Sequence, residues 1–133
     1  MRSATWDATA DSSGAATERS VALYEELAKG GLGLIVTGYA FVSPLGQAKG
    51  GQYGAHTDAV IPGLRRLAEV AHQSDARIAA QLVHSGLRSD YLYSKGIAAL
   101  AISKMENITR PHREMTNEEI EAIITDFSSA AQR

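Results

Sequence analysis

The sequence Arg-Ile-Ala-Ala-Gln-Leu-Val-His-Ser-Gly-Leu-Arg at residues 77–88 has the clearest structural pattern in this chain. Its first seven residues are largely apolar at neighbouring positions, which is typical of a parallel strand buried on both faces. Gln81 interrupts this run near the C-terminal end of the predicted strand, where ligands of α/β folds bind. Its amide offers a donor and an acceptor side by side. Gln81 is therefore interpreted either as a residue that binds the edge of a heterocycle or as one that bonds neighbouring backbone.

The composition is that of one domain with a hydrophobic core. The 133 residues are 44% hydrophobic and 21% charged, and the formal charge of −2 gives no electrostatic reason to expect nucleic acid or an anionic membrane. The absence of cysteine excludes disulfides and thiolate chemistry. No metal site is predicted, because four histidines lack the spacing of metal ligands: His56, His72, His84 and His112.

Neither a signal peptide nor a membrane-spanning segment is expected. The chain turns polar directly after its first two residues. The longest mostly apolar stretch, residues 32–42, is far shorter than the roughly 20 residues that cross a bilayer as a helix. We therefore expect a soluble, cytoplasmic protein.

Two helices and a second strand precede residues 77–88. Thr17 is the predicted N-cap of the first helix, whose basic end is followed by Gly30 and Gly31. Residues 33–38 form a short apolar run that ends in glycine and predict a buried parallel strand. The second helix begins near Pro62, because proline suits the first turn of a helix.

The remaining segments are two long loops and a last helix. Residues 39–57 are rich in glycine but lack the Gly-Lys-Ser/Thr sequence that leads from a phosphate loop into a helix. Residues 85–115 show no strong periodicity and predict a second long loop. A capping box from Thr116 to Glu119 starts the last helix, whose apolar residues continue at helical spacing to the end of the chain.

The order of these elements predicts an α/β fold with parallel strands and right-handed crossovers. The predicted strands are apolar on both faces, and three helices cannot cover both faces of their sheet. A closed eight-stranded barrel takes about 250 residues. We therefore expect residues 1–133 to be a single partial domain, the N-terminal portion of an incomplete (β/α)8 TIM barrel.

Four segments resemble the old yellow enzyme family, the NADH:flavin oxidoreductases, in order and spacing. They are Arg-Ser-Ala-Thr-Trp at residues 2–6, the helix and strand at residues 17–40, Gln-Leu-Val-His-Ser-Gly at residues 81–86, and Met-Thr-Asn-Glu-Glu-Ile at residues 115–120. The resemblance covers nearly the whole chain and is weakest in the loop that follows Gly86. It implies a flavin-bearing barrel in which FMN passes hydride from NAD(P)H to a small-molecule substrate, an activated alkene or a similar acceptor.

The resemblance also implies a set of cofactor-binding residues, namely Ser3, Ala4, Thr5, Trp6, Gly38 and Gln81. The first four belong to the exit of the first strand, along the isoalloxazine ring. Trp6 departs from the family, since many members have Thr or Cys there to tune the flavin potential. Gly38 lets the pyrimidine side of the flavin approach the backbone, and Gln81 matches the family glutamine that hydrogen-bonds the pyrimidine edge.

The catalytic residues of the family belong to later strands and have no counterpart here, so no catalytic residue is assigned. The flavin-phosphate site is likewise expected outside these residues. His84 has opposite parity to Gln81 and is expected to anchor its loop. The alternative function is a catalytically silent barrel fragment that self-associates through its apolar strands, as a homo-oligomer or with the remainder of the barrel.

Overall fold

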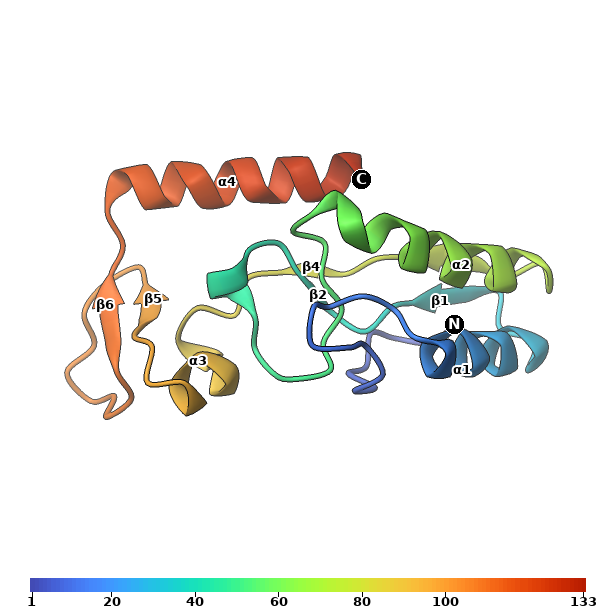
Figure 1. The fold of residues 1–133 in the computed structure, drawn as a ribbon, viewed down its shortest axis with the longest axis horizontal. Helices are drawn as coiled ribbons and strands as arrows, with labels where there is room; N and C mark the ends of the chain where they lie inside the picture. Colours follow the sequence, from blue (N-terminus) through green and yellow to red (C-terminus); the bar gives the residue numbers. More distant parts are fainter.

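The structure, a computed structural model, describes residues 1–133 and contains parallel strands that alternate with helices (Figure 1). Helix α1 (Glu18–Lys29) leads into strand β1 (Leu34–Val36), and helix α2 (Ile61–His72) leads into strand β3 (Arg77–Ala79). This repeat of helix and parallel strand is the architecture of part of a (β/α)8 barrel, as the sequence predicted.

Three segments of the chain run parallel in the first sheet. β1 pairs with β3, with Ile35 opposite Ile78. Arg2 forms a parallel bridge to Ile35, in which Arg2 N donates to Leu34 O at 2.9 Å and Val36 N donates to Arg2 O at 3.0 Å. Arg2 therefore adds the start of the chain to the parallel arrangement of β1 and β3. We call Arg2, Ile35 and Ile78 the bridged row.

Local capping determines where the two long helices begin. Thr17 accepts a hydrogen bond from Ser20 N, and Ser20 Oγ accepts one from Thr17 N, which satisfies two N–H groups at the start of α1. Gly31 follows this helix with a φ of +78°, a left-handed conformation that favours glycine. Pro62 lies in the first turn of α2. Both predicted helix starts are confirmed.

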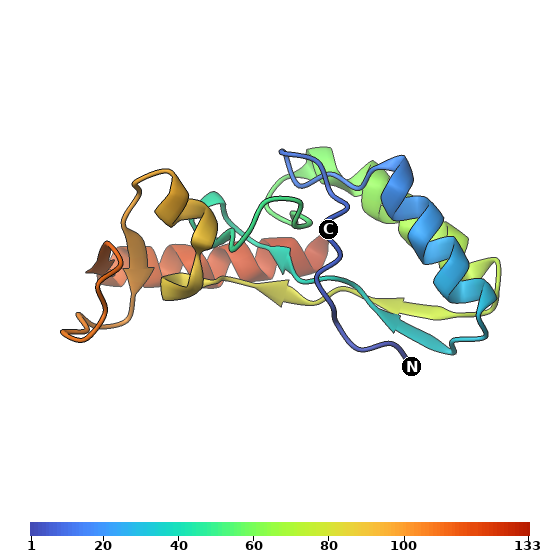
Figure 2. The ribbon, with the colours of Figure 1, turned by 90° about the horizontal axis from the view of Figure 1, so that it is seen from below.

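The hydrophobic core lies on one side of the sheet. Figure 2 shows α1 and α2 together on one side of β1 and β3, with no helix on the other side. Fully burying a leucine or isoleucine side chain stabilises a fold by about 1.5–3 kcal/mol. The buried residues between these helices and the sheet include Tyr24, Ala28, Ile35, Leu67 and Ala71.

The predicted strand at residues 77–83 is shorter and less buried than expected. It is divided into β3 and a second strand, β4 (Leu82–Val83), which pairs in parallel with β2 (Ala40–Phe41). The prediction of burial on both faces is wrong, because the helices cover only one face. The exposed residues of this stretch are Arg77, Ala79, Ala80 and Gln81.

Both predicted loops contain short regular elements. Residues 39–57 include β2 and a 3₁₀ turn at Pro44–Gly46. The prediction of an irregular loop at residues 85–115 is wrong, because this segment contains two strands that pair in parallel and a short helix. Elements of two to five residues are too short to produce a periodic pattern. Those of the second segment are η3 (Gly86–Arg88), α3 (Asp90–Ser94), β5 (Ala99–Ala101) and β6 (His112–Glu114).

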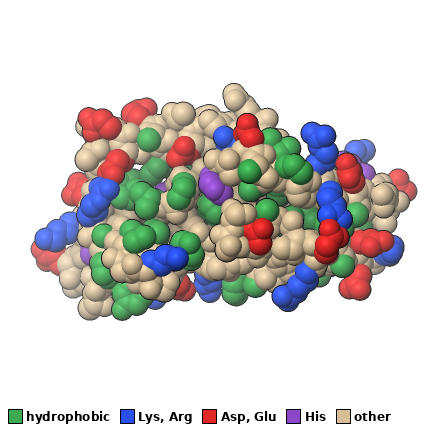
Figure 3. Space-filling model, in the orientation of Figure 1, with side chains coloured by type: hydrophobic (Ala, Val, Ile, Leu, Met, Phe, Trp, Pro, Cys, Tyr) green, Lys and Arg blue, Asp and Glu red, His purple; other side chains and the backbone are tan.

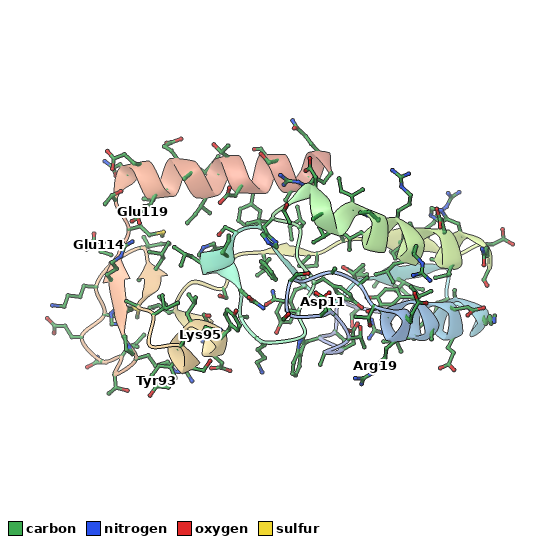
Figure 4. All side chains as sticks on the ribbon, in the orientation of Figure 1. Asp11, Arg19, Tyr93, Lys95, Glu114 and Glu119 are labelled. Carbon is green, nitrogen blue, oxygen red and sulfur yellow. The ribbon has the colours of Figure 1, made fainter.

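Helix α4 (Asn117–Gln132) begins at the predicted capping box. Thr116 caps Glu119 N, and the Glu119 carboxylate accepts from Thr116 N at 3.0 Å and pairs with Arg113. The hydrogen bond from Arg113 lowers the pKa of Glu119 to about 2. Glu119 lies at the junction of β6 and α4 in Figure 4, which also shows Tyr93 far from α1.

The apolar side of α4 is only partly covered. Ile124 is 54% exposed and Ile120 is 36% exposed. Figure 3 shows hydrophobic side chains on the molecular surface between α4 and α3. None of the helices, α4 included, combines the length and the hydropathy needed to cross a bilayer.

Candidate functional site

The C-terminal ends of three parallel segments meet at one edge of the sheet. Each residue of the bridged row is followed three positions later by a predicted site residue. Arg2 is followed by Thr5, Ile35 by Gly38 and Ile78 by Gln81. A Cβ placed on Gly38 would lie 3.0 Å from Thr5 O, and Gln81 N donates to Thr37 Oγ1 at 3.3 Å. We call Thr5, Gly38 and Gln81 the exit row. The structure thus places three of the six predicted site residues next to one another.

Three of the six predicted residues have side chains on the face of the sheet that no helix covers. Ser3, Thr5 and Gln81 are exposed, whereas Ala4 is half-buried. Side chains alternate between the two faces of a strand. The other face carries Ile78, which lines a cavity together with residues of α2. The uncovered face is therefore the one to which the Gln81 side chain belongs.

The Gln81 side chain is exposed, whereas its backbone is fixed by hydrogen bonds. Its backbone is held on both sides, because Gln81 N donates to Thr37 Oγ1 and Gln81 O accepts from Ala40 N at 2.7 Å. The exposed side-chain amide, however, has no hydrogen-bond partner in the chain. The alternative interpretation, in which the Gln81 amide bonds neighbouring backbone, is therefore wrong.

Trp6 extends from the strand exit toward the following loops. The residue is 39% exposed, and Lys49 Nζ lies 4.9 Å from the ring centroid, within the range of a cation–π interaction. The same ammonium group lies 4.0 Å from the Asp90 carboxylate of α3. Trp6 therefore contacts the loop that carries Lys49 and does not lie in the exit row.

Gly38 is tightly enclosed by its own chain. Its missing Cβ would meet Thr5 O at 3.0 Å, the Tyr53 ring at 3.4 Å and Asp7 Oδ2 at 3.5 Å. Gly38 N donates to Tyr24 Oη at 3.0 Å. Packing within the chain thus explains why this position has no side chain, whether or not a ligand approaches its backbone.

A buried polar network behind Gly38 was not predicted from the sequence. Tyr24 and Tyr53 are almost fully buried, with their rings edge to face and their centroids 6.2 Å apart. Tyr53 Oη lies 2.6 Å from Thr9 Oγ1, which donates to Asp7 Oδ1 at 2.8 Å. Burial raises the pKa of both tyrosines above the ordinary value of 10, because a buried phenolate would lose its hydration. Tyrosine at a core position was the available signal, because a buried hydroxyl requires a partner.

His84 anchors the loop that follows β4, as expected. Its Nδ1 accepts a hydrogen bond from Gly86 N at 3.2 Å, and its ring lies against Gly46, where a Cβ would come within 2.7 Å of His84 Cδ2. His84 Nε2 is buried without a partner. Burial lowers the pKa of His84, and the Asp126 carboxylate of α4 acts in the opposite direction.

The main cavity lies on the helix side of the sheet. It has a volume of about 500 Å³ and a largely apolar lining between α2, the strands and the end of α4. The exit row does not line it, so the candidate site is an open surface at the ends of the strands. The chain contains no cluster of three or more His, Asp or Glu side chains that could hold a metal ion.

Comparison with known sequences gives one family over the full length. The sequence model of the NADH:flavin oxidoreductase / NADH oxidase family matches residues 1–133. A metal reductase of Desulforamulus reducens is 35% identical over 122 residues, which cover 90% of this chain and 18% of that protein. An NADPH dehydrogenase of Listeria monocytogenes is 33% identical over 120 residues, 90% of this chain and 35% of that protein. The chain therefore spans about a third or less of these relatives.

Solved structures have the same fold over 98% of this chain. A 2-naphthoyl-CoA reductase in complex with 2-naphthoyl-CoA superposes with a TM-score of 0.90 and 29% identity, and the match covers 22% of that chain. Old Yellow Enzyme from Pichia sp. AKU4542 superposes with a TM-score of 0.85 and 23% identity, over 37% of its chain. The parallel arrangement described above thus recurs within larger chains.

Proposed function

The chain belongs to the NADH:flavin oxidoreductase / NADH oxidase family, and from this we propose that it forms part of the flavin site of an FMN-dependent oxidoreductase. The proposed reaction transfers hydride from NAD(P)H through FMN to an activated alkene or a similar small-molecule acceptor. In this proposal residues 1–133 are a single partial domain that contributes the first strands of the barrel. The observation that supports it most is the exit row, because it gathers residues from three parallel strands at the edge where such folds bind ligands.

The residues at this edge fit one side of a flat heterocycle. The free amide of Gln81 offers a donor and an acceptor in one plane, which match the imide edge of a pyrimidine ring. Thr5 is exposed on the other side of Gly38, whose backbone lies between Thr5 and Gln81. In our proposal Gln81 holds the pyrimidine edge, and the backbone of Ser3, Ala4 and Thr5 supports the ring.

Trp6 distinguishes this chain within the proposed site. Its partly exposed ring and the adjacent Lys49 ammonium form an apolar and cationic margin at the strand exit. In our proposal Trp6 contacts the margin of the bound ring. The flavin supplies the hydride chemistry when bound, and these residues bind and orient it.

A flavin titration of the 133-residue polypeptide tests this proposal. The family resemblance places the flavin-phosphate residues outside this chain, so we expect FMN to be lost on desalting, because the missing contacts cost several kcal/mol. At millimolar FMN, weak binding should be measurable by the decrease in flavin fluorescence. Gln81→Leu, which removes the amide at similar volume, should raise the dissociation constant about five- to tenfold. Equal affinity of the two proteins would remove Gln81 from the site.

Self-association is the second candidate function. The sheet is uncovered on one face, and Ile124 and Ile120 of α4 are exposed. Exposed apolar surface of this kind drives association between chains. Light scattering over a range of concentrations should then give a mass above that of the monomer, and Ile124→Lys should lower it. A polypeptide that keeps its yellow cofactor after desalting, with bleaching that depends on NAD(P)H, would refute a catalytically silent fragment.

A further inference from the structure

The Gly38 peptide at the centre of the exit row is held by a residue of helix α1. Tyr24 Oη accepts the Gly38 N–H at 3.0 Å, and the Tyr24 side chain is fully buried. Gly38 itself is buried, so water does not replace this acceptor. The hydrogen bond joins the middle of α1 to the end of β1, across the sheet's covered face.

The same strand exit also holds the backbone of Gln81. Thr37 precedes Gly38, and its side-chain oxygen accepts Gln81 N at 3.3 Å. Thr37 N donates to Ala79 O at 2.9 Å. A shift of the peptide that joins Thr37 to Gly38 would therefore reach the Gln81 backbone through Thr37 Oγ1, while Thr37 N stays bonded to Ala79 O within the sheet.

A second set of contacts fixes Tyr24 from behind. Tyr53 Oη lies 2.6 Å from Thr9 Oγ1, and both hydroxyl groups also donate to the Asp7 carboxylate, Thr9 Oγ1 at 2.8 Å and Tyr53 Oη at 3.4 Å. The edge-to-face contact of the Tyr53 and Tyr24 rings then limits how Tyr24 can tilt. Tyr24 is thus constrained by packing on one side and by its hydrogen bond on the other.

We propose that Tyr24 is a positioning residue of the flavin site, which sets the Gly38 peptide and through it the exit row. The inference rests on the proposed function and extends it to a residue that touches no ligand. The hydroxyl group acts through the backbone, because it is separated from the uncovered face by the strand itself. A buried N–H that loses its only acceptor must move or admit water.

Tyr24→Phe tests this role, because it removes one oxygen and keeps the ring. We expect exchange of the Gly38 amide hydrogen in the flavin-free protein to accelerate about tenfold or more, and the dissociation constant for FMN to rise about three- to tenfold. The Thr37 amide, which is bonded to Ala79 O, should keep its exchange rate. Unchanged exchange at Thr37 identifies a local effect, whereas equal acceleration at both amides would indicate general unfolding and overturn the positioning role.

Tyr53→Phe is the matched variant. It removes a buried hydroxyl group of the same network and leaves the bond between Tyr24 and Gly38 intact, so Gly38 exchange should change less than about twofold. If wild-type protein and Tyr24→Phe bind FMN with the same affinity, the positioning role is overturned and the proposed function stands. If FMN leaves the wild-type protein entirely unbound at millimolar concentration, the proposed function is overturned, and the positioning role with it.

Discussion

The two faces of the parallel sheet differ more than any other two regions of the molecule. Ile35 is fully buried beneath α1 and α2, next to Tyr24 and Leu67. Thr5 and Gln81 are exposed, and no helix lies on the opposite side of β1 and β3 (Figure 2). The covered face contains the side chains whose burial stabilises the fold, and the uncovered face contains those proposed to bind flavin.

Because the two faces differ in burial, we expect side chains on one face to determine the free energy of unfolding and those on the other to determine the affinity for flavin. Substitutions on the covered face should change the free energy of unfolding, because they alter packed surface. Substitutions on the uncovered face should change affinity for flavin with little effect on folding, because exposed side chains contribute little to stability. Gly38 and Tyr24 lie between these cases, since they join the two faces through the backbone.

The largest effect is expected for a cavity in the covered face. Leu67→Ala removes a buried side chain of α2 and should lower the free energy of unfolding by about 2–5 kcal/mol. Thr5→Ala on the uncovered face should change it by less than about 0.5 kcal/mol. Urea unfolding followed by circular dichroism measures both. Similar losses for the two variants would contradict the separation of the faces.

A smaller loss of stability is expected for a substitution at Gly38 in the exit row. Gly38→Ala places a methyl group 3.0 Å from Thr5 O and should destabilise the protein by about 1–3 kcal/mol, because backbone must shift to admit it. Gly33→Ala is the control, since a Cβ there has no neighbour within 4 Å. Thermal unfolding measures the stability of both variants. A Gly38→Ala protein as stable as Gly33→Ala would show that the exit is loosely packed.

The smallest expected effect is the contribution of His84 to the pH dependence of the free energy of unfolding. Burial holds the pKa of this histidine below its ordinary value of 6.5, so the unfolded chain binds more protons than the folded one between the two values. The contribution of neutral His84 to the free energy of unfolding is therefore fully present above pH 6.5. It is lost as the pH falls from 6.5 through the lower pKa of the folded state. His56, whose pKa burial also lowers, acts in the same direction. His84→Gln should make the pH dependence of the free energy of unfolding, measured by urea unfolding at several pH values, shallower.

The sequence predicted those parts of the fold that depend on local chemistry. Thr17, Pro62 and Thr116 mark helix starts, because capping involves residues only a few positions apart. The two-residue strand at Ala40–Phe41 left no detectable pattern, since two residues have no periodicity. Burial of residues 77–83 was misjudged, because burial depends on what packs against a strand and not on the strand's own residues.

The site was predicted only in part, for a related reason. The residues of the exit row were found through family resemblance, and the structure places them side by side. The hydrogen bond from Gly38 to Tyr24 joins residues 14 positions apart and depends on how α1 packs on the sheet. Contacts of this kind follow from tertiary structure, so a helical pattern identifies Tyr24 as a core residue but not as an acceptor.

The most direct test of the account is an NMR titration of the isotope-labelled chain with FMN. If the uncovered face binds the ring edge, the Gln81 side-chain amide and the backbone signals of Thr5 and Gly38 should shift together, while Leu67 and Ala71 on the covered face stay in place. Shifts confined to residues around the apolar cavity, or none at Gln81 at saturating FMN, would contradict the assignment of the exit row as part of a flavin site.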